Sequence, residues 1–421
     1  MSAFRRTRLR VLGAGWLALT LIMAGCGSGG GGSSSSGSSS SSSGGGGPIV
    51  IGADLPMTGS LARFGTLMKL AYQTEINQVN QVGGVDVGGQ KRKVKLVILD
   101  DGSDPQKASS NTSTLVLKDG AVGLLGTATP PVVIPQAQVA ERQQVPLVSP
   151  ICPLRACLSA APSGGYKSSW FFFFDEAQMT NTQYKVMDMD KSNHKVALFT
   201  DQEQDGQVMG GLWAKNAPGD GYQVVYHATF PVGTTDFSTF IRKAQASGAQ
   251  IMISQMIPPD AITLWKQMKS LGWKPKAAFM EKSANTAAWY QGLGPDVKGV
   301  MVSSWWSDTL GYPQTQFAVK TFGKAAQGNV EIAQCVNAYT AAQILTDAIA
   351  RAGSTDPAKI NQAIGRTNKT YVAGHIQFSS QHISVQPTIM LQWQGNGQTL
   401  PIYPADKSGG NKMIYPLPPW K

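Results

Sequence analysis

Histidine and cysteine, the side chains that most often carry out catalysis or bind metals, are few and widely spaced in this sequence. The 421 residues include four histidines and four cysteines. The motifs His-Glu-x-x-His, Gly-x-Ser-x-Gly and Gly-x4-Gly-Lys-Ser/Thr are all missing, so no zinc protease, α/β-hydrolase or P-loop ATPase is indicated. We therefore predict no catalytic residue, no metal and no cofactor. The histidines, which we interpret as surface or core residues, are His194, His227, His375 and His382.

Two of the cysteines, Cys152 and Cys157, are separated by only four residues. In an oxidising compartment they can form a disulfide that closes a small loop, and the alternative is two reduced thiols. Cys335 lies inside a helical pattern and is interpreted as a buried, unreactive thiol. The cysteines are too few to form a disulfide scaffold for a chain of this length.

The amino-terminal residues have the composition of a targeting segment followed by a linker. Four arginines precede an apolar run at 11–23, which is too short to span a bilayer stably but suits a signal-peptide core. The run ends in Met23-Ala24-Gly25-Cys26, which resembles the bacterial lipobox, and 27–47 contains only glycine and serine. We predict a lipoprotein signal peptide at 1–25, lipidation of Cys26 and a flexible tether at 26–47. A plain secretory signal with an incidental cysteine is the alternative.

The formal net charge of the whole chain is +11. Removal of the signal peptide takes away four arginines and leaves about +7. The lysines are scattered, apart from the run Lys91-Arg92-Lys93, and an exported protein rarely meets nucleic acid. We therefore interpret the charge as a solvated surface and predict that the protein does not bind nucleic acid. We also predict a monomer.

From Pro48 onward, short apolar runs alternate with helical patterns about every 25 residues, which predicts βαβ units and parallel sheets. The aromatic run at 170–174 reads as a crossover strand, after which the alternation restarts, so we expect an α/β protein with two lobes. Further crossovers are expected at 299–304 and 371–378. The other expected strands are 49–51, 94–99, 122–125 and 146–149 in the first series and 195–199, 224–226, 251–254 and 277–280 in the second.

Short motifs in a fixed order carry a family resemblance over most of the chain. They include Phe64-Gly65 after the first strand, Leu99-Asp100-Asp101 with Asp104-Pro105, the turn at Gly126, residues 146–150, Asp236-Phe237, residues 269–272 and Ala338-Tyr339. In this order they resemble the branched-chain amino acid (leucine/isoleucine/valine) substrate-binding proteins of ABC transporters, which have the type I periplasmic-binding fold.

The resemblance implies two Rossmann-like lobes with parallel sheets, joined by three hinge crossovers. It places lobe 1 at 48–173 and 304–374, and lobe 2 at 174–303 and 375–421. It also implies a small-molecule solute, partner permease and ATPase subunits, and an extracytoplasmic, lipid-anchored location on a bacterial membrane. The competing hypothesis is a lipoprotein of the same fold that senses a ligand or regulates a cell-wall enzyme, and the presence or absence of neighbouring permease and ATPase genes would separate the two.

Site residues follow from the resemblance, position by position. Relatives hold an α-carboxylate with a serine and a threonine hydroxyl. The matching neighbourhoods here contain Pro130 and Pro131, which have no amide hydrogen to donate, and Leu154, which has no hydroxyl. Glu281 falls where relatives keep the acid that pairs with an ammonium. We therefore expect an amino-acid-like solute, or an aromatic or branched carboxylate or amide. The predicted ligand-binding residues are Phe64, Thr129, Pro130, Cys152, Leu154, Asp205, Ile257, Glu281 and Trp305.

Overall fold

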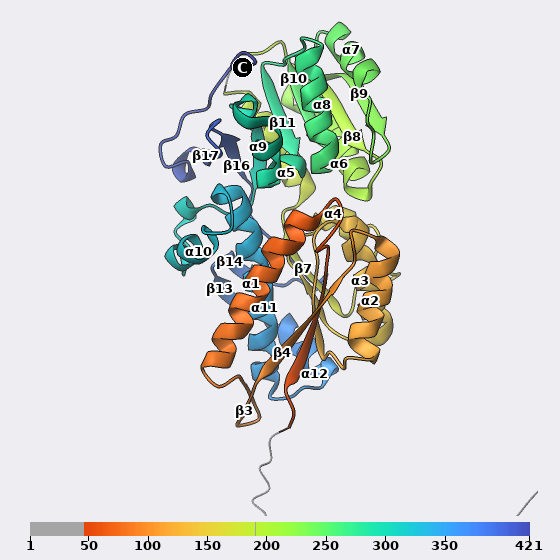
Figure 1. The fold of residues 1–421 in the computed structure, drawn as a ribbon, viewed down its shortest axis with the longest axis vertical. Coiled ribbons are helices and arrows are strands. Elements are labelled where there is room, and N and C mark those ends of the chain that lie inside the picture. Colours follow the sequence, from red (N-terminus) through yellow and green to blue (C-terminus); the bar gives the residue numbers. More distant parts are fainter. Residues whose placement is uncertain (1–45, 190) are drawn as a thin grey trace, which may run out of the picture. The chain divides into compact units, whose positions relative to one another are not determined.

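The first of two large sheets contains only parallel strands (Figure 1). The computed structural model describes residues 46–189 and 191–421, so Cys26, the predicted signal peptide and most of the predicted tether lie outside the described residues. In sheet order, the strands are β15 (Ile383–Val385), β7 (Ser169–Phe173), β6 (Leu147–Ser149), β5 (Gly123–Leu125), β1 (Ile49–Leu55) and β4 (Val94–Asp100).

Helices cover both faces of this sheet, which explains why its strands read as apolar runs. In Figure 1 the sheet lies between two pairs of helices, α1 with α11 and α2 with α3. Asp104 accepts hydrogen bonds from the amides of Gln106 and Lys107 and so caps α2, as its place before Pro105 predicts. The helices are α1 (Ala62–Gln81), α2 (Pro105–Leu117), α3 (Pro130–Gln143), α4 (Leu154–Leu158), α10 (Thr315–Phe322), α11 (Gly328–Ala352) and α12 (Pro357–Gly365).

The second large sheet is mixed. The pairs β12–β16 and β16–β17 are antiparallel, and the remaining pairs are parallel. Its order is β17 (Thr399–Tyr403), β16 (Ile389–Trp393), β12 (Met301–Ser304), β11 (Ala277–Glu281), β10 (Ile251–Gln255), β8 (Lys195–Asp201) and β9 (Gln223–Phe230). The helices of this lobe are α5 (Glu176–Met187), α6 (Gln204–Asn216), α7 (Ser238–Ala246), α8 (Pro258–Ser270) and α9 (Ala287–Leu293).

The chain passes between the two sheets three times, after β7, after β12 and between β15 and β16. The third passage differs from the sequence expectation. Residues 371–378 do not cross between the lobes, because they belong largely to a hairpin of β13 (Asn368–Tyr371) and β14 (Gly374–Gln377), and β15 still pairs with β7. We therefore propose that the third lobe boundary lies at 386–388 rather than at 374–375.

Hydrogen bonds of Gln386 hold this third passage. Its side-chain amide exchanges two hydrogen bonds with Asn337 of α11, at 2.7 and 3.0 Å, and donates a third to the carbonyl of Ala373.

A small hairpin of β2 (Val85–Val87) and β3 (Gln90–Arg92) lies beside α11. Among the residues that the structure describes, no helix is both long and apolar enough to span a bilayer.

Candidate functional site

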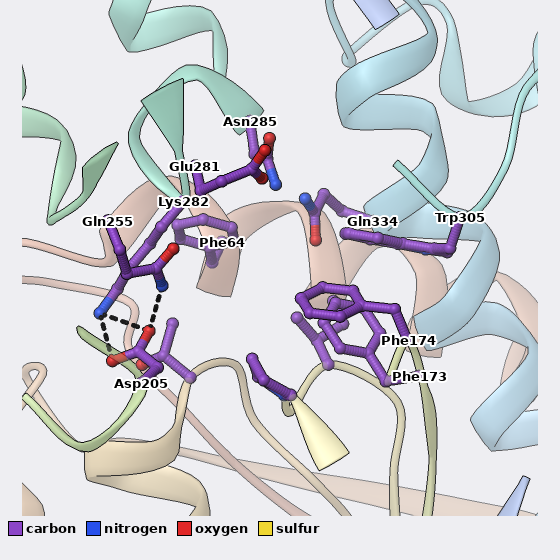
Figure 2. A pocket seen from close by; sticks show the side chains of 13 residues that line it. Phe64, Phe173, Phe174, Asp205, Gln255, Glu281, Lys282, Asn285, Trp305 and Gln334 are labelled. Carbon is purple, nitrogen blue, oxygen red and sulfur yellow. Dashed lines mark hydrogen bonds and ion pairs between the residues drawn. The ribbon is translucent and has the colours of Figure 1, made fainter. Parts of the chain in front are cut away.

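A cavity lies between the two lobes at the carboxyl ends of their strands (Figure 2). It encloses about 390 Å³ of empty space, including its opening to solvent. Loops and helix starts that follow β1, β5, β6, β8, β11 and β12 supply most of its lining, as is usual for ligand sites in open α/β sheets. The lining residues are Phe64, Thr129, Ile151, Pro153, Phe173, Phe174, Asp205, Gln255, Glu281, Lys282, Asn285, Trp305 and Gln334.

The structure brings five of the predicted ligand-binding residues to this cavity: Phe64, Thr129, Asp205, Glu281 and Trp305. The other four, Pro130, Cys152, Leu154 and Ile257, are buried but do not line it. Ile151 and Pro153, the sequence neighbours of Cys152 and Leu154, line the cavity instead. At both places a shift of one position along the chain exchanges a lining residue for a buried one.

Cys152 is also not a free thiol, because the structure pairs it with Cys157 in a disulfide. Leu154 begins the short helix α4, where the backbone amides of Arg155 and Ala156 both donate to the Glu176 carboxylate at 2.8 Å. These two amides could otherwise hold a ligand carboxylate at the helix start. Glu176 of the other lobe occupies them instead.

Lys282 is the main cavity residue that sequence reasoning missed. Its ammonium forms ion pairs with Glu203 and with Asp205, the latter at 3.2 Å, and Gln255 donates to the same Asp205 carboxylate at 2.6 Å. Burial alone would lower the pKa of Lys282, but the carboxylates of Asp205, Glu203 and Asp201 raise it well above its usual range. The sequence feature that could have identified Lys282 as a cavity residue is its position beside Glu281, at the end of a predicted strand.

The three carboxylates around Lys282 lie close enough together to form an acidic cluster. Oxygen atoms of Asp201, Glu203 and Asp205 all lie within 4.8 Å of one another. Burial raises the pKa of Asp201 to about 8 despite the nearby Lys282 cation. The ammonium therefore neutralises part of the cluster's charge.

Glu281 is engaged by its own lobe. Its Oε1 accepts hydrogen bonds from the Ser303 amide at 3.0 Å, the Ser303 hydroxyl at 2.8 Å and the Gln183 amide at 2.6 Å. Burial outweighs these contacts and raises the pKa of Glu281 to about 7. An ammonium partner for Glu281, which the resemblance implies, remains a prediction.

Aromatic rings form the apolar side of the cavity. Phe173 packs on Trp305 with ring centroids 4.3 Å apart and on Phe174 at 4.4 Å. The indole N–H of Trp305 donates to the Ala333 carbonyl, so its hydrogen-bonding need is met within the protein. A flat or branched apolar group can contact this surface without leaving a polar atom unpaired.

Two cavity residues adopt backbone conformations that are unusual for residues with a side chain. Thr129 has φ of 73° and Lys282 has φ of 63°. Such positions cost on the order of 1–3 kcal/mol each and concentrate at functional sites. The strain therefore agrees with a binding role for this region.

Comparisons with known proteins agree on the family and on the fold of this chain. A family model described as "Periplasmic binding protein" matches residues 48–398. The "Leu/Ile/Val-binding protein homolog 2" of Brucella abortus (strain 2308) is 26% identical over 354 residues, which cover 82% of this chain and 90% of that protein. Two structures share the fold at lower sequence identity.

The first of these structures is a leucine binding protein from Thermotoga maritima, with a TM-score of 0.73 and 22% identity over 84% of this chain and 97% of that one. The second is a solute binding protein from R. palustris in complex with benzoate, with a TM-score of 0.72 and 19% identity over 87% of this chain and 99% of that one. Both likenesses indicate a common fold of two lobes.

Proposed function

Because the chain belongs to the periplasmic binding protein family, whose members bind solutes and are not enzymes, we propose that it delivers one particular class of solute to an ABC importer. The solute is amino-acid-like, or an aromatic or branched carboxylate or amide. The cavity between the lobes is the single observation that carries this proposal, because both lobes line it and closure would bury a small molecule.

The names and ligands of the relatives support a small solute that has both an apolar and a polar part. Leucine, isoleucine and valine appear in the names of curated relatives, and benzoate is bound in one structure of the same fold. Phe64, Phe173 and Trp305 favour an apolar body, and Thr129 is the only hydroxyl-bearing residue among the described residues of the lining, whereas the resemblance implies both a serine and a threonine for an α-carboxylate. Each missing donor costs roughly 1–3 kcal/mol, so free leucine should bind weakly.

Mass spectrometry of the molecule that co-purifies with the protein tests the proposal directly. Calorimetric titration of the refolded, ligand-free protein with leucine, isoleucine, valine and benzoate should then follow. We expect the branched-chain amino acids to bind more weakly than micromolar. Tighter binding of any of them would restore the ordinary ligand of the family, and absence of any bound small molecule would contradict the proposal as a whole.

We also propose that Cys26 carries a lipid anchor. The support comes from the sequence, where small residues precede the cysteine and a glycine-serine tether follows it. Several acyl chains hold a protein firmly on a membrane, whereas one chain gives only marginal binding. Cys26→Ala should move the protein from the membrane fraction to the soluble fraction, and a variant that remained on the membrane would refute the anchor.

A further inference from the structure

Three side chains of the cavity lining carry polar atoms that have no hydrogen-bond partner. They are both amide atoms of Gln334, the hydroxyl of Thr129 and the Oδ1 of Asn285. Gln334 is fully buried, and Thr129 and Asn285 are 5% and 7% exposed. Buried polar groups in folded proteins are almost always paired, so a cluster of unpaired ones around a cavity points to a bound partner.

The charged side chains of the same cavity, in contrast, already have partners. Lys282 is paired with Glu203 and Asp205, and Asp205 also accepts from Gln255. Glu281 accepts three hydrogen bonds on one oxygen from Ser303 and Gln183. The unpaired atoms therefore belong to uncharged side chains.

The unpaired glutamine is well placed to contact a ligand. Figure 2 shows the Gln334 amide extending from α11 beside Trp305 toward the space opposite Phe64. Either orientation of the amide leaves one donor and one acceptor facing the cavity. Asn285 supplies a further acceptor from the opposite lobe, and the Thr129 hydroxyl can donate or accept.

We infer that the solute presents an uncharged group with both a donor and an acceptor, such as a primary carboxamide, to Gln334, Asn285 and Thr129. Its apolar body lies against Phe64, Phe173 and Trp305. This inference rests on the proposed function and narrows its solute class. A carboxylate has no hydrogen to give to the acceptors of Gln334 and Asn285, and no cation in the lining is free to neutralise it.

Matched pairs of small probes test the inference. The full-length chain is purified in detergent, unfolded and refolded to remove solute, and titrated calorimetrically with benzamide against benzoate, and with 3-methylbutanamide against 3-methylbutanoate. Leucine serves as the zwitterionic probe. The amide of at least one pair should bind about tenfold or more tightly than its carboxylate, since hydrogen bonds to uncharged groups account for factors of this size.

Substitution of Gln334 identifies the residue that makes the distinction. Gln334→Leu should weaken binding of the amide about tenfold and reduce the amide-to-carboxylate ratio toward one. Gln343→Leu is the matched control, because Gln343 lies on the same helix but outside the cavity lining, and it should leave the ratio unchanged. Should the Gln334 variant fail to fold, Asn285→Ala provides the same comparison from the other lobe.

The outcomes separate the inference from the proposed function. If benzoate, 3-methylbutanoate or leucine binds and neither amide binds more tightly than its carboxylate, the inference is overturned and the proposed function stands. An amide preference that survives both Gln334→Leu and Asn285→Ala also overturns it. If no probe and no co-purified molecule binds, the proposed function fails and the inference fails with it.

Discussion

At the scale of single residues, the buried Lys282 determines the charge balance of the cavity. It is 6% exposed, and its ammonium pairs with two carboxylates, one of them that of Asp205, which is 1% exposed. Removing one partner of a buried ion pair leaves the other as an uncompensated charge, which is far more costly than losing a surface pair. Lys282 therefore compensates the charge of a carboxylate that the protein buries beside it.

We predict that Lys282→Met lowers the free energy of unfolding by about 3–5 kcal/mol at neutral pH. Lys369→Met is the matched control, because Lys369 pairs with Asp347 at 2.7 Å but is 55% exposed on its side chain, and its loss should cost less than about 1 kcal/mol. Urea denaturation of both variants and the parent measures the difference. Equal losses would contradict the role assigned to Lys282.

Sequence alone predicted some of these residues and not others, for physical reasons. Phe64, Asp205 and Trp305 follow strand ends, where an α/β sheet places its ligands, and they line the cavity. Gln334 lies between two apolar residues inside a long helix. Nothing in the sequence distinguishes a buried amide that lacks a hydrogen-bond partner from one that has a partner. Only the three-dimensional contacts reveal that difference.

At the scale of secondary-structure elements, the short helix α4 depends on contacts from outside. A helix of five residues is not stable by itself, because forming the first turn fixes the backbone of several residues for a single hydrogen bond. The Cys152–Cys157 disulfide closes the loop that contains α4. The Glu176 carboxylate accepts hydrogen bonds from the backbone amides of Arg155 and Ala156 at the start of α4. Because Glu176 begins α5 of the other lobe, α4 also links the two lobes.

We predict that Glu176→Gln changes how stability depends on pH. Burial raises the pKa of Glu176 to about 7 from 4.5, so in the parent its contribution is fully present below the unfolded value and is lost as the pH rises through 7. From pH 5 to pH 8 the variant should therefore gain about 2–3 kcal/mol of stability relative to the parent.

Urea denaturation at both pH values measures this change. Asp236→Asn is the control. The pKa of Asp236 is lowered by its hydrogen bonds to Ser238, and a carboxyl whose pKa is lowered adds no change between pH 5 and pH 8. A Glu176 variant that remained parallel to the parent across this range would refute the assignment.

The alternation of strands and helices in the first lobe was predictable because helices cover both faces of its sheet, which produces continuous apolar runs. The third passage was not. Residues 371–378 contain an apolar run that resembles a crossover strand, but they form most of a hairpin that is partly exposed along β13. The passage itself follows β15, a strand of three residues with an exposed Val385, which gives no such run.

At the scale of the whole molecule, a few contacts connect the lobes around the cavity. Glu331 at the start of α11 accepts from Arg63 of the first lobe and from the amide of Ala287 in the second, the latter at 2.6 Å. Gln204 donates to Ser159 across the same boundary at 2.9 Å. Such polar contacts can be broken and remade as the lobes rotate about the three passages.

We predict that a saturating solute closes the lobes and reduces the radius of gyration, because short connecting segments absorb backbone changes while the lobes remain rigid. Small-angle X-ray scattering of the refolded protein with and without solute measures the change. A compound that shows no binding by calorimetry serves as the control. Identical radii in the presence and absence of a saturating solute would remove the support for closure.

The burial of Glu281 has a consequence for the exchange of protons between the protein and its buffer. A carboxyl with a pKa of about 7 is partly protonated at neutral pH. An uncharged solute that displaces water from the cavity raises this pKa further, so its binding takes up a fraction of a proton. A solute with an ammonium group lowers the pKa, so its binding releases a fraction of a proton. Titrations at pH 7 in phosphate and in Tris, whose ionisation enthalpies differ, report the direction of net proton transfer, and the part of it that Glu281→Gln removes reports the charge of the solute beside Glu281.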